Sequence, residues 1–131
     1  MYLDSTAVLA LLLDQAEAPE LARRIEKAKS PLIISPMSLL EAAVGLSNAT
    51  GAPISKTQEL VNEFLTLSKI QVISITPEIG RRAAQAYEKH GKKASETGKL
   101  NMGDAMIYAC AKAYRAPLLS TGGRFSGLDL S

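Results

Sequence analysis

Several residue types are scarce in this chain of 131 residues, which has no tryptophan, one cysteine and one histidine. The single cysteine, Cys110, cannot form an intramolecular disulfide, and its alanine-rich surroundings are typical of a small buried residue rather than a reactive thiol. The single histidine, His90, lies in a polar segment, and we expect it to be exposed and not to act as a general base. The sequence therefore excludes a disulfide framework and does not indicate thiol or histidine catalysis.

Excess charge, aromatic stripes and long apolar runs are also missing. The net charge is only +2, which does not indicate nucleic-acid binding by itself, so any basic patch must be local. The four tyrosines are scattered and form no stripe on which bases could stack. The N-terminal apolar run is short, contains Asp4 and follows no basic segment. We therefore expect a cytoplasmic protein without a signal peptide or a membrane helix.

What the chain does contain is an alternation of short apolar, β-branched segments with helical segments. The length fits one domain, residues 1–131. Strands are expected at residues 1–3, 32–34, 70–75 and 117–120, and helices at residues 6–13, 19–29, 36–49, 55–67, 77–89 and 100–113. This order predicts an α/β fold with a parallel sheet covered by helices on both faces. Ligands of such folds bind at the carboxyl ends of the strands.

Helix starts and helix faces can also be predicted. Ser35, Thr76 and Asn101 are the expected N-caps of three helices, and residues 90–99 are an expected polar loop. Apolar periodicity places Leu60, Val61, Phe64 and Leu67 on one face of their helix, and Met102, Ala105, Met106, Ala109 and Ala113 on the core-facing side of the last helix.

Three carboxylates stand alone in otherwise uncharged stretches. Asp4 is the only charged residue within residues 1–13, Glu41 within residues 30–55, and Asp104 within residues 100–111. Each follows a strand end or lies in the first turns of an apolar helix, where the carboxyl edge of the sheet would bring the three together. Converging carboxylates repel one another unless a cation lies between them. Oxygen ligands without His or Cys nearby suit Mg²⁺ or Mn²⁺ rather than zinc.

Each acid also has a structural alternative. Asp4 would serve as the N-cap of the first helix, and Asp104, three residues after Asn101, would belong to a capping arrangement. Glu41 is harder to explain in this way, because it lies about five residues into its helix, beyond the reach of the cap and the dipole. A purely structural role for all three acids is less probable than such a role for any one of them.

At this point the sequence resembles the PIN-domain ribonucleases, and within them the VapC toxins of toxin-antitoxin pairs. The resemblance covers essentially the whole chain and rests on YLDSTAVLALLL, SLLEAAVGL, LNMGDAMIYACAKAYRAPLL and GGRFSGLDL. It implies a PIN-like three-layer α/β/α fold with a central parallel sheet of four to five strands. It also implies that Asp4, Glu41 and Asp104 are the metal-binding and catalytic acids, that Thr6 supports Asp4, and that Asn101 orders the last helix.

The function implied by the resemblance is Mg²⁺- or Mn²⁺-dependent hydrolysis of RNA phosphodiester bonds by the toxin of a type II toxin-antitoxin system. The implied partners are an RNA substrate, a small VapB-like antitoxin and a second copy of the chain in a homodimer. A local cluster of basic residues would contact the RNA backbone, or would simply form a solvated face: Arg81, Arg82, Lys89, Lys92, Lys93 and Lys99.

The sequence departs from the family pattern in the last loop, where a fourth acid usually precedes the phenylalanine. Gly123 and Arg124 stand before Phe125, and neither is acidic. Asp129 is a possible substitute, or a turn residue; Arg124 would contact phosphate, or neutralise the acids without metal. The alternative function is therefore a degenerate, non-catalytic PIN-like binding module. A phosphoacceptor domain is disfavoured, because it would have paired acids after the first strand and a lysine after the last one.

Overall fold

The computed structural model describes residues 1–91 and 99–129. Its elements, in order, are β1 (Tyr2–Leu3), α1 (Ser5–Leu12), α2 (Ala18–Lys27), β2 (Ile33–Ile34), α3 (Pro36–Thr50), α4 (Ile54–Leu67), β3 (Gln71–Val72), α5 (Pro77–His90), α6 (Met102–Ala113) and β4 (Leu118–Leu119). The strands pair in parallel in the order β3-β2-β1-β4. The expected α/β fold with a parallel sheet is confirmed.

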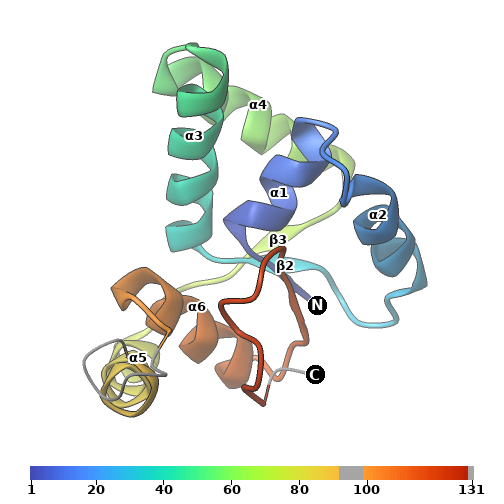
Figure 1. Ribbon diagram of the computed structural model, residues 1–131. Helices are drawn as coiled ribbons and strands as arrows, with labels where there is room; N and C mark the ends of the chain where they lie inside the picture. The colour runs from blue at the N-terminus through green and yellow to red at the C-terminus, as the bar shows by residue number, and fades with distance from the viewer. Residues whose placement is uncertain (92–98, 130–131) are drawn as a thin grey trace.

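The sheet separates two apolar cores, because successive residues of a strand point to opposite faces. Leu3 of β1 packs in the core formed with α1 to α4, whereas Tyr2 packs in the core formed with α5 and α6. Strands β2 and β4 divide their residues between the two cores in the same way. The result is a three-layer α/β/α arrangement, in which α1 to α4 lie on one side of the sheet and α5 with α6 on the other (Figure 1).

The expected helix starts are confirmed by their hydrogen bonds. The side chains of Ser35, Thr76 and Asn101 accept backbone N–H groups in the first turns of α3, α5 and α6. Pro36 and Pro77 occupy the first helical positions, where a missing N–H costs nothing. These caps fix the entry of α3 and α6, the two helices that carry Glu41 and Asp104.

Several expectations about burial are wrong. Met102 is 76% exposed, because it is the first residue of α6 and lies beyond the packed part of the helix. The buried stripe of α4 is Thr57, Val61 and Leu65, so that Leu60 and Leu67 lie outside it. His90 is half-buried rather than exposed, because α5 continues to this residue and its ring packs edge-on against Tyr108.

The third strand is also shorter than expected, Gln71–Val72 instead of residues 70–75. Both of its residues are exposed, since β3 is an edge strand that pairs only with β2. Most of the expected loop at residues 90–99, with Lys92 and Lys93, lies outside the described residues. No described helix has the length and hydrophobicity needed to cross a membrane.

Candidate functional site

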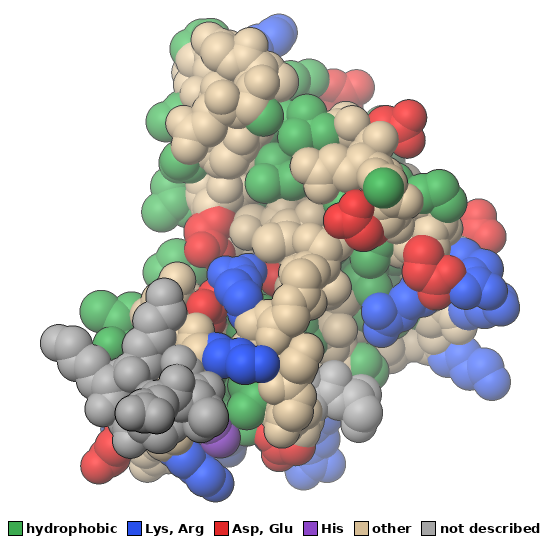
Figure 2. Space-filling view, viewed as in Figure 1, with side chains coloured by type: hydrophobic (Ala, Val, Ile, Leu, Met, Phe, Trp, Pro, Cys, Tyr) green, Lys and Arg blue, Asp and Glu red, His purple; other side chains and the backbone are tan. Residues whose placement is uncertain are grey.

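The three isolated acids come from three elements that meet at the carboxyl edge of the sheet. Asp4 directly follows β1, Glu41 lies in the second turn of α3, and Asp104 lies in the first turn of α6. One side chain of the final loop joins two of them, because the Arg124 guanidinium donates hydrogen bonds to Asp104 Oδ1 and to Asp4 Oδ2. Figure 2 shows acidic and basic side chains next to one another where α3, α6 and the final loop meet.

Asp4 is fully buried and accepts hydrogen bonds on both carboxylate oxygens. Its Oδ1 accepts the Thr6 hydroxyl at 2.6 Å and the Ala7 N–H at 3.1 Å, and its Oδ2 accepts the Ser120 hydroxyl. The helix-cap alternative is thus true in part, since Asp4 caps α1. The cap uses only Oδ1, and the second oxygen faces Ser120 and Arg124.

Asp104 is 1% exposed and takes part in a reciprocal capping box with Asn101. The Asn101 side chain accepts the Asp104 N–H at 2.7 Å, while Asp104 Oδ2 accepts the Asn101 N–H at 3.2 Å. The same division is seen as at Asp4, because one oxygen serves the cap and Oδ1 is free to contact Arg124. The role expected for Asn101, ordering the start of this helix, agrees with this geometry.

The Glu41 carboxylate lies near the first turn of α6, but one of its oxygens has no hydrogen-bond partner among the described residues. A β-carbon added at Gly103 would lie 3.4 Å from Glu41 Oε2, so this carboxylate lies against the start of α6. Its Oε1 is buried and has no hydrogen-bond partner in the part of the chain that the structure describes. Burial raises the pKa of Glu41; the Arg124 guanidinium opposes this rise, and the charges of Asp104 and Asp4 add to it. A buried, unpartnered carboxylate oxygen is costly unless a ligand contacts it.

Arg124 is held over the acids by its own loop. Its guanidinium carbon lies 5.4 Å from the centre of the Phe125 ring, and this ring packs against the core of α5 and α6. Gly122 has a φ of +80°, a left-handed conformation that glycine adopts at little cost, so the chain turns here after β4. Arg124 thus places its positive charge against both aspartates, and its neutralising role in the absence of metal stays a prediction.

The donor set fits a hard divalent cation in kind, because it consists of carboxylate and hydroxyl oxygens with one unpartnered acid oxygen. The side chains are nevertheless not arranged as a ready metal site. Within residues 1–91 and 99–129, no three acidic, histidine or cysteine side chains are gathered so that they could hold a metal ion. Arg124 supplies the positive charge between Asp4 and Asp104.

Asp129 contacts a different set of residues. It accepts hydrogen bonds from the Tyr108 hydroxyl and from Lys112 Nζ, both on α6. These bonds, that from Lys112 foremost, hold the pKa of Asp129 down at about 2. Asp129 thus attaches the end of the final loop to the exposed side of α6.

Sequence reasoning missed Ser120 as a residue of this site. Its hydroxyl contacts Asp4 Oδ2 and lies 3.2 Å from the Thr6 hydroxyl, while Thr6 Oγ1 also accepts the Thr121 N–H at 2.8 Å. The available signal was its position, the first hydroxyl residue after the last strand. This position points to the site only once it is known that β4 pairs with β1, which places Ser120 beside Asp4.

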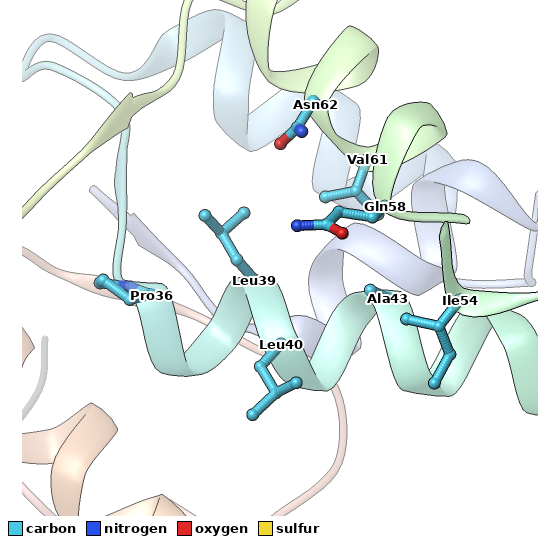
Figure 3. Close-up of a pocket in the computed structure, with 8 residues that line it drawn as sticks. All are labelled: Pro36, Leu39, Leu40, Ala43, Ile54, Gln58, Val61 and Asn62. Carbon is cyan, nitrogen blue, oxygen red and sulfur yellow. The ribbon is translucent and has the colours of Figure 1, made fainter. Parts of the chain in front are cut away.

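Other hollows lie outside the acidic site. A groove of about 300 Å³ between α3 and α4 is lined mainly by apolar side chains, and none of the described residues that line it is charged (Figure 3). A second hollow of about 270 Å³ between α5 and α6, here called the α5–α6 basic groove, is lined by Arg82, Lys89, His90 and Lys112 among others. Neither contains a carboxylate, so the acidic site is the candidate for chemistry.

Comparisons with known proteins agree with this fold. Residues 1–129 match the family model described as PIN domain. The chain is 30% identical to a VapC ribonuclease of Rhizobium meliloti (strain 1021), over 98% of each chain. It is 28% identical to Ribonuclease VapC42 of Mycobacterium tuberculosis (strain ATCC 25618 / H37Rv), over 99% of this chain and 96% of that one.

Two solved structures share the architecture. Mycobacterium tuberculosis VapC20, a Sarcin-Ricin loop cleaving toxin, superposes with a TM-score of 0.79 at 15% identity, covering 99% of this chain and 95% of that chain. A toxin-antitoxin complex from Klebsiella pneumoniae superposes with a TM-score of 0.71 at 20% identity, covering 98% of this chain and 92% of that chain. At these identities the superpositions show the fold alone. The sequence matches show that the chain belongs to the PIN-domain family, as a homologue of the VapC ribonucleases.

Proposed function

We propose that this protein is an endoribonuclease that hydrolyses RNA phosphodiester bonds with Mg²⁺ or Mn²⁺ and acts as the toxin of a type II toxin-antitoxin pair. The observation that carries the proposal is the convergence of Asp4 and Asp104 on one cationic group, beside the unpartnered oxygen of Glu41. Homology to VapC ribonucleases over nearly the full length supports the nuclease class.

In this proposal, Asp4, Glu41 and Asp104 hold the divalent cation. The cation, when bound, supplies the Lewis acidity that activates water and stabilises negative charge on the phosphate. The chain contributes orientation: Thr6 and Ser120 hold the Asp4 carboxylate, and the capping box with Asn101 holds Asp104. Preorganised carboxylates need no rearrangement during the reaction, which lowers its barrier. No protein nucleophile is required.

The partners belong to the proposal as well. A small VapB-like antitoxin that covers the site is supported by the homology to VapC proteins and by the fold shared with a toxin-antitoxin complex. The RNA backbone would be contacted by basic residues outside the acidic site, among them Arg82 and Lys89. The homodimer remains a prediction from the resemblance.

The test is cleavage of a labelled RNA with Mg²⁺ or Mn²⁺, with and without EDTA. Asp104→Asn should lower the rate about 100-fold or more, as EDTA should, because the variant loses one of the acids proposed to hold the cation. The matched control is Asp14→Asn, which makes the same change at an exposed residue whose φ of +51° asparagine tolerates. Equal activity of Asp104→Asn and wild type, or no cleavage by folded wild type with either metal, would contradict the proposal.

One observation favours a second candidate, the non-catalytic PIN-like binding module. Arg124 occupies the place between Asp4 and Asp104, and the usual fourth acid is absent at positions 123 and 124. A protein that binds RNA or the antitoxin, shows no cleavage with Mg²⁺ or Mn²⁺, and is unaffected by Asp104→Asn would be such a module.

A further inference from the structure

Arg124 contacts both buried aspartates although it comes from a loop at the surface. Asp4 and Asp104 have exposed side-chain fractions of 0% and 1%, whereas that of Arg124 is 33%. Two carboxylates buried close together are unfavourable without a compensating positive charge. In the structure, the Arg124 guanidinium provides that charge, with one nitrogen on each aspartate.

The positions of the two aspartates do not depend on Arg124. Asp4 is oriented by hydroxyl and N–H donors from its own helix start and from Ser120, and Asp104 is oriented by the backbone of Asn101. These donors are independent of the arginine, so both carboxylates stay directed toward the same place when the guanidinium leaves. Arg124 is therefore a counter-ion of the site and not its scaffold.

The guanidinium also balances only part of the negative charge of the three acids. It carries a single positive charge and contacts two acids, while Glu41 Oε1 has no partner among the described residues. A divalent cation between the three acids would contribute twice the charge and could contact the third carboxylate. The guanidinium and such a cation need the same two oxygens, Asp4 Oδ2 and Asp104 Oδ1, and cannot both be bound there in this geometry.

The Arg124 side chain can also move away from the aspartates into solvent. Its side chain is one-third exposed, its loop leaves the sheet through Gly122 in a left-handed conformation, and its remaining contact is the face of Phe125. Among the described residues, moving the guanidinium outward breaks its two hydrogen-bonded contacts with carboxylates, and the charged head can be hydrated there.

We propose that Arg124 is an internal counter-ion that a divalent cation must displace, so that this residue lowers the metal affinity of the site. The inference rests on the proposed metal-dependent function. Asp4, Glu41 and Asp104 would then hold the cation, and Arg124 would turn toward solvent when they do. The apparent metal affinity is reduced by the fraction of molecules in which Arg124 occupies the acids.

The experiment is a calorimetric titration of the purified full chain with Mn²⁺, without RNA. Arg124→Gln should bind Mn²⁺ about tenfold or more tightly than wild type. Arg24→Gln removes the same charge from an exposed position of α2 and should bind Mn²⁺ as wild type does. Thermal unfolding gives a second readout, in which Mn²⁺ should raise the Tm of Arg124→Gln more than that of wild type, relative to each protein in EDTA.

The outcomes separate this inference from the proposed function. Equal or weaker Mn²⁺ binding by Arg124→Gln than by wild type overturns the inference and leaves metal binding standing. Absence of Mn²⁺ binding in all three proteins overturns both. If the glutamine variant does not fold, Arg124→Lys replaces it. Lysine lacks the two separate guanidinium nitrogens that contact Asp104 and Asp4, so tighter Mn²⁺ binding than in wild type is again expected, and unchanged binding overturns the inference.

Discussion

The Ser120 hydroxyl donates a hydrogen bond to Asp4 Oδ2, joining two side chains that are 116 positions apart in the sequence. The bond links the carboxyl ends of β1 and β4, which are neighbours in the sheet. Since Asp4 is fully buried, the hydroxyl replaces part of the hydration that this carboxylate loses on folding.

Ser120→Ala should therefore lower the free energy of unfolding by about 1–3 kcal/mol, the usual cost of removing a hydrogen bond to a buried charge. Chemical denaturation in EDTA measures it. The control is Ser126→Ala in the same loop, whose residue is exposed, with an expected change within about 0.5 kcal/mol. A Ser120→Ala protein as stable as this control would show that the bond contributes nothing.

Glu41→Gln should be at least as stable as wild type in EDTA, because the substitution removes a buried charge near Asp104 and Asp4. Burial raises the pKa of Glu41 above its ordinary value of 4.5, so the folded state binds the proton more tightly than the unfolded state. Ionisation then destabilises the fold, and the advantage of the variant should grow as the pH rises from about 4.5 through the raised pKa. Denaturation curves at several pH values measure this; a variant clearly less stable at neutral pH would assign Glu41 a structural role.

Tyr2→Phe should destabilise the protein by about 1–3 kcal/mol, since Ser35 Oγ and Ser38 Oγ each lose a buried hydrogen bond, although Ser35 Oγ keeps that from the Ser38 N–H. The Tyr2 hydroxyl lies 2.5 Å from Ser35 Oγ and 2.7 Å from Ser38 Oγ, at the start of the helix that carries Glu41. Tyr114→Phe is the matched control, because that hydroxyl is exposed and makes one long bond of 3.3 Å. Thermal unfolding compares the two variants, and similar Tm values for both would contradict the prediction.

Gly91→Ala should destabilise the end of α5, by about 1–3 kcal/mol, through overpacking. A β-carbon at Gly91 would lie 2.4 Å from the Tyr87 carbonyl oxygen and 2.9 Å from the Tyr87 ring. Gly80→Ala in the same helix meets no atom within 4 Å and should instead stabilise by about 0.5–1 kcal/mol, because alanine favours the helix. Opposite signs in urea denaturation are the expected result; two changes of the same sign would disprove the steric assignment.

In an Asp104→Asn background, which is expected to bind RNA without cleaving it, Lys89→Gln should weaken RNA binding and should reduce the slope of log affinity against log salt by about one. Lys89 lines the α5–α6 basic groove. Lys27→Gln, at the exposed end of α2, is the control and should leave both quantities unchanged. Filter binding at several salt concentrations measures the slope, and an unchanged slope for Lys89→Gln would remove this groove from the RNA surface.

Local features of the sequence predicted much of the fold. Alternating strands and helices, the N-caps at Ser35 and Thr76, and the isolation of Asp4, Glu41 and Asp104 depend on neighbours within a few positions along the chain. Expectations failed where burial depends on distant elements: Val72 is exposed because β3 is an edge strand, and Leu67 because α4 turns another face to α3.

The sequence by itself determined the fold class, the helix starts and the isolation of three acids in uncharged stretches. The reason is that backbone hydrogen bonding and apolar periodicity act over one or two turns. Only the tertiary structure decided that Ser120 contacts Asp4, that Asp129 binds α6, and that Arg124 contacts Asp4 and Asp104. The physical reason is the strand order, which places β4 beside β1 and brings the final loop over the acids. Such contacts between distant residues have no periodic signal along the chain.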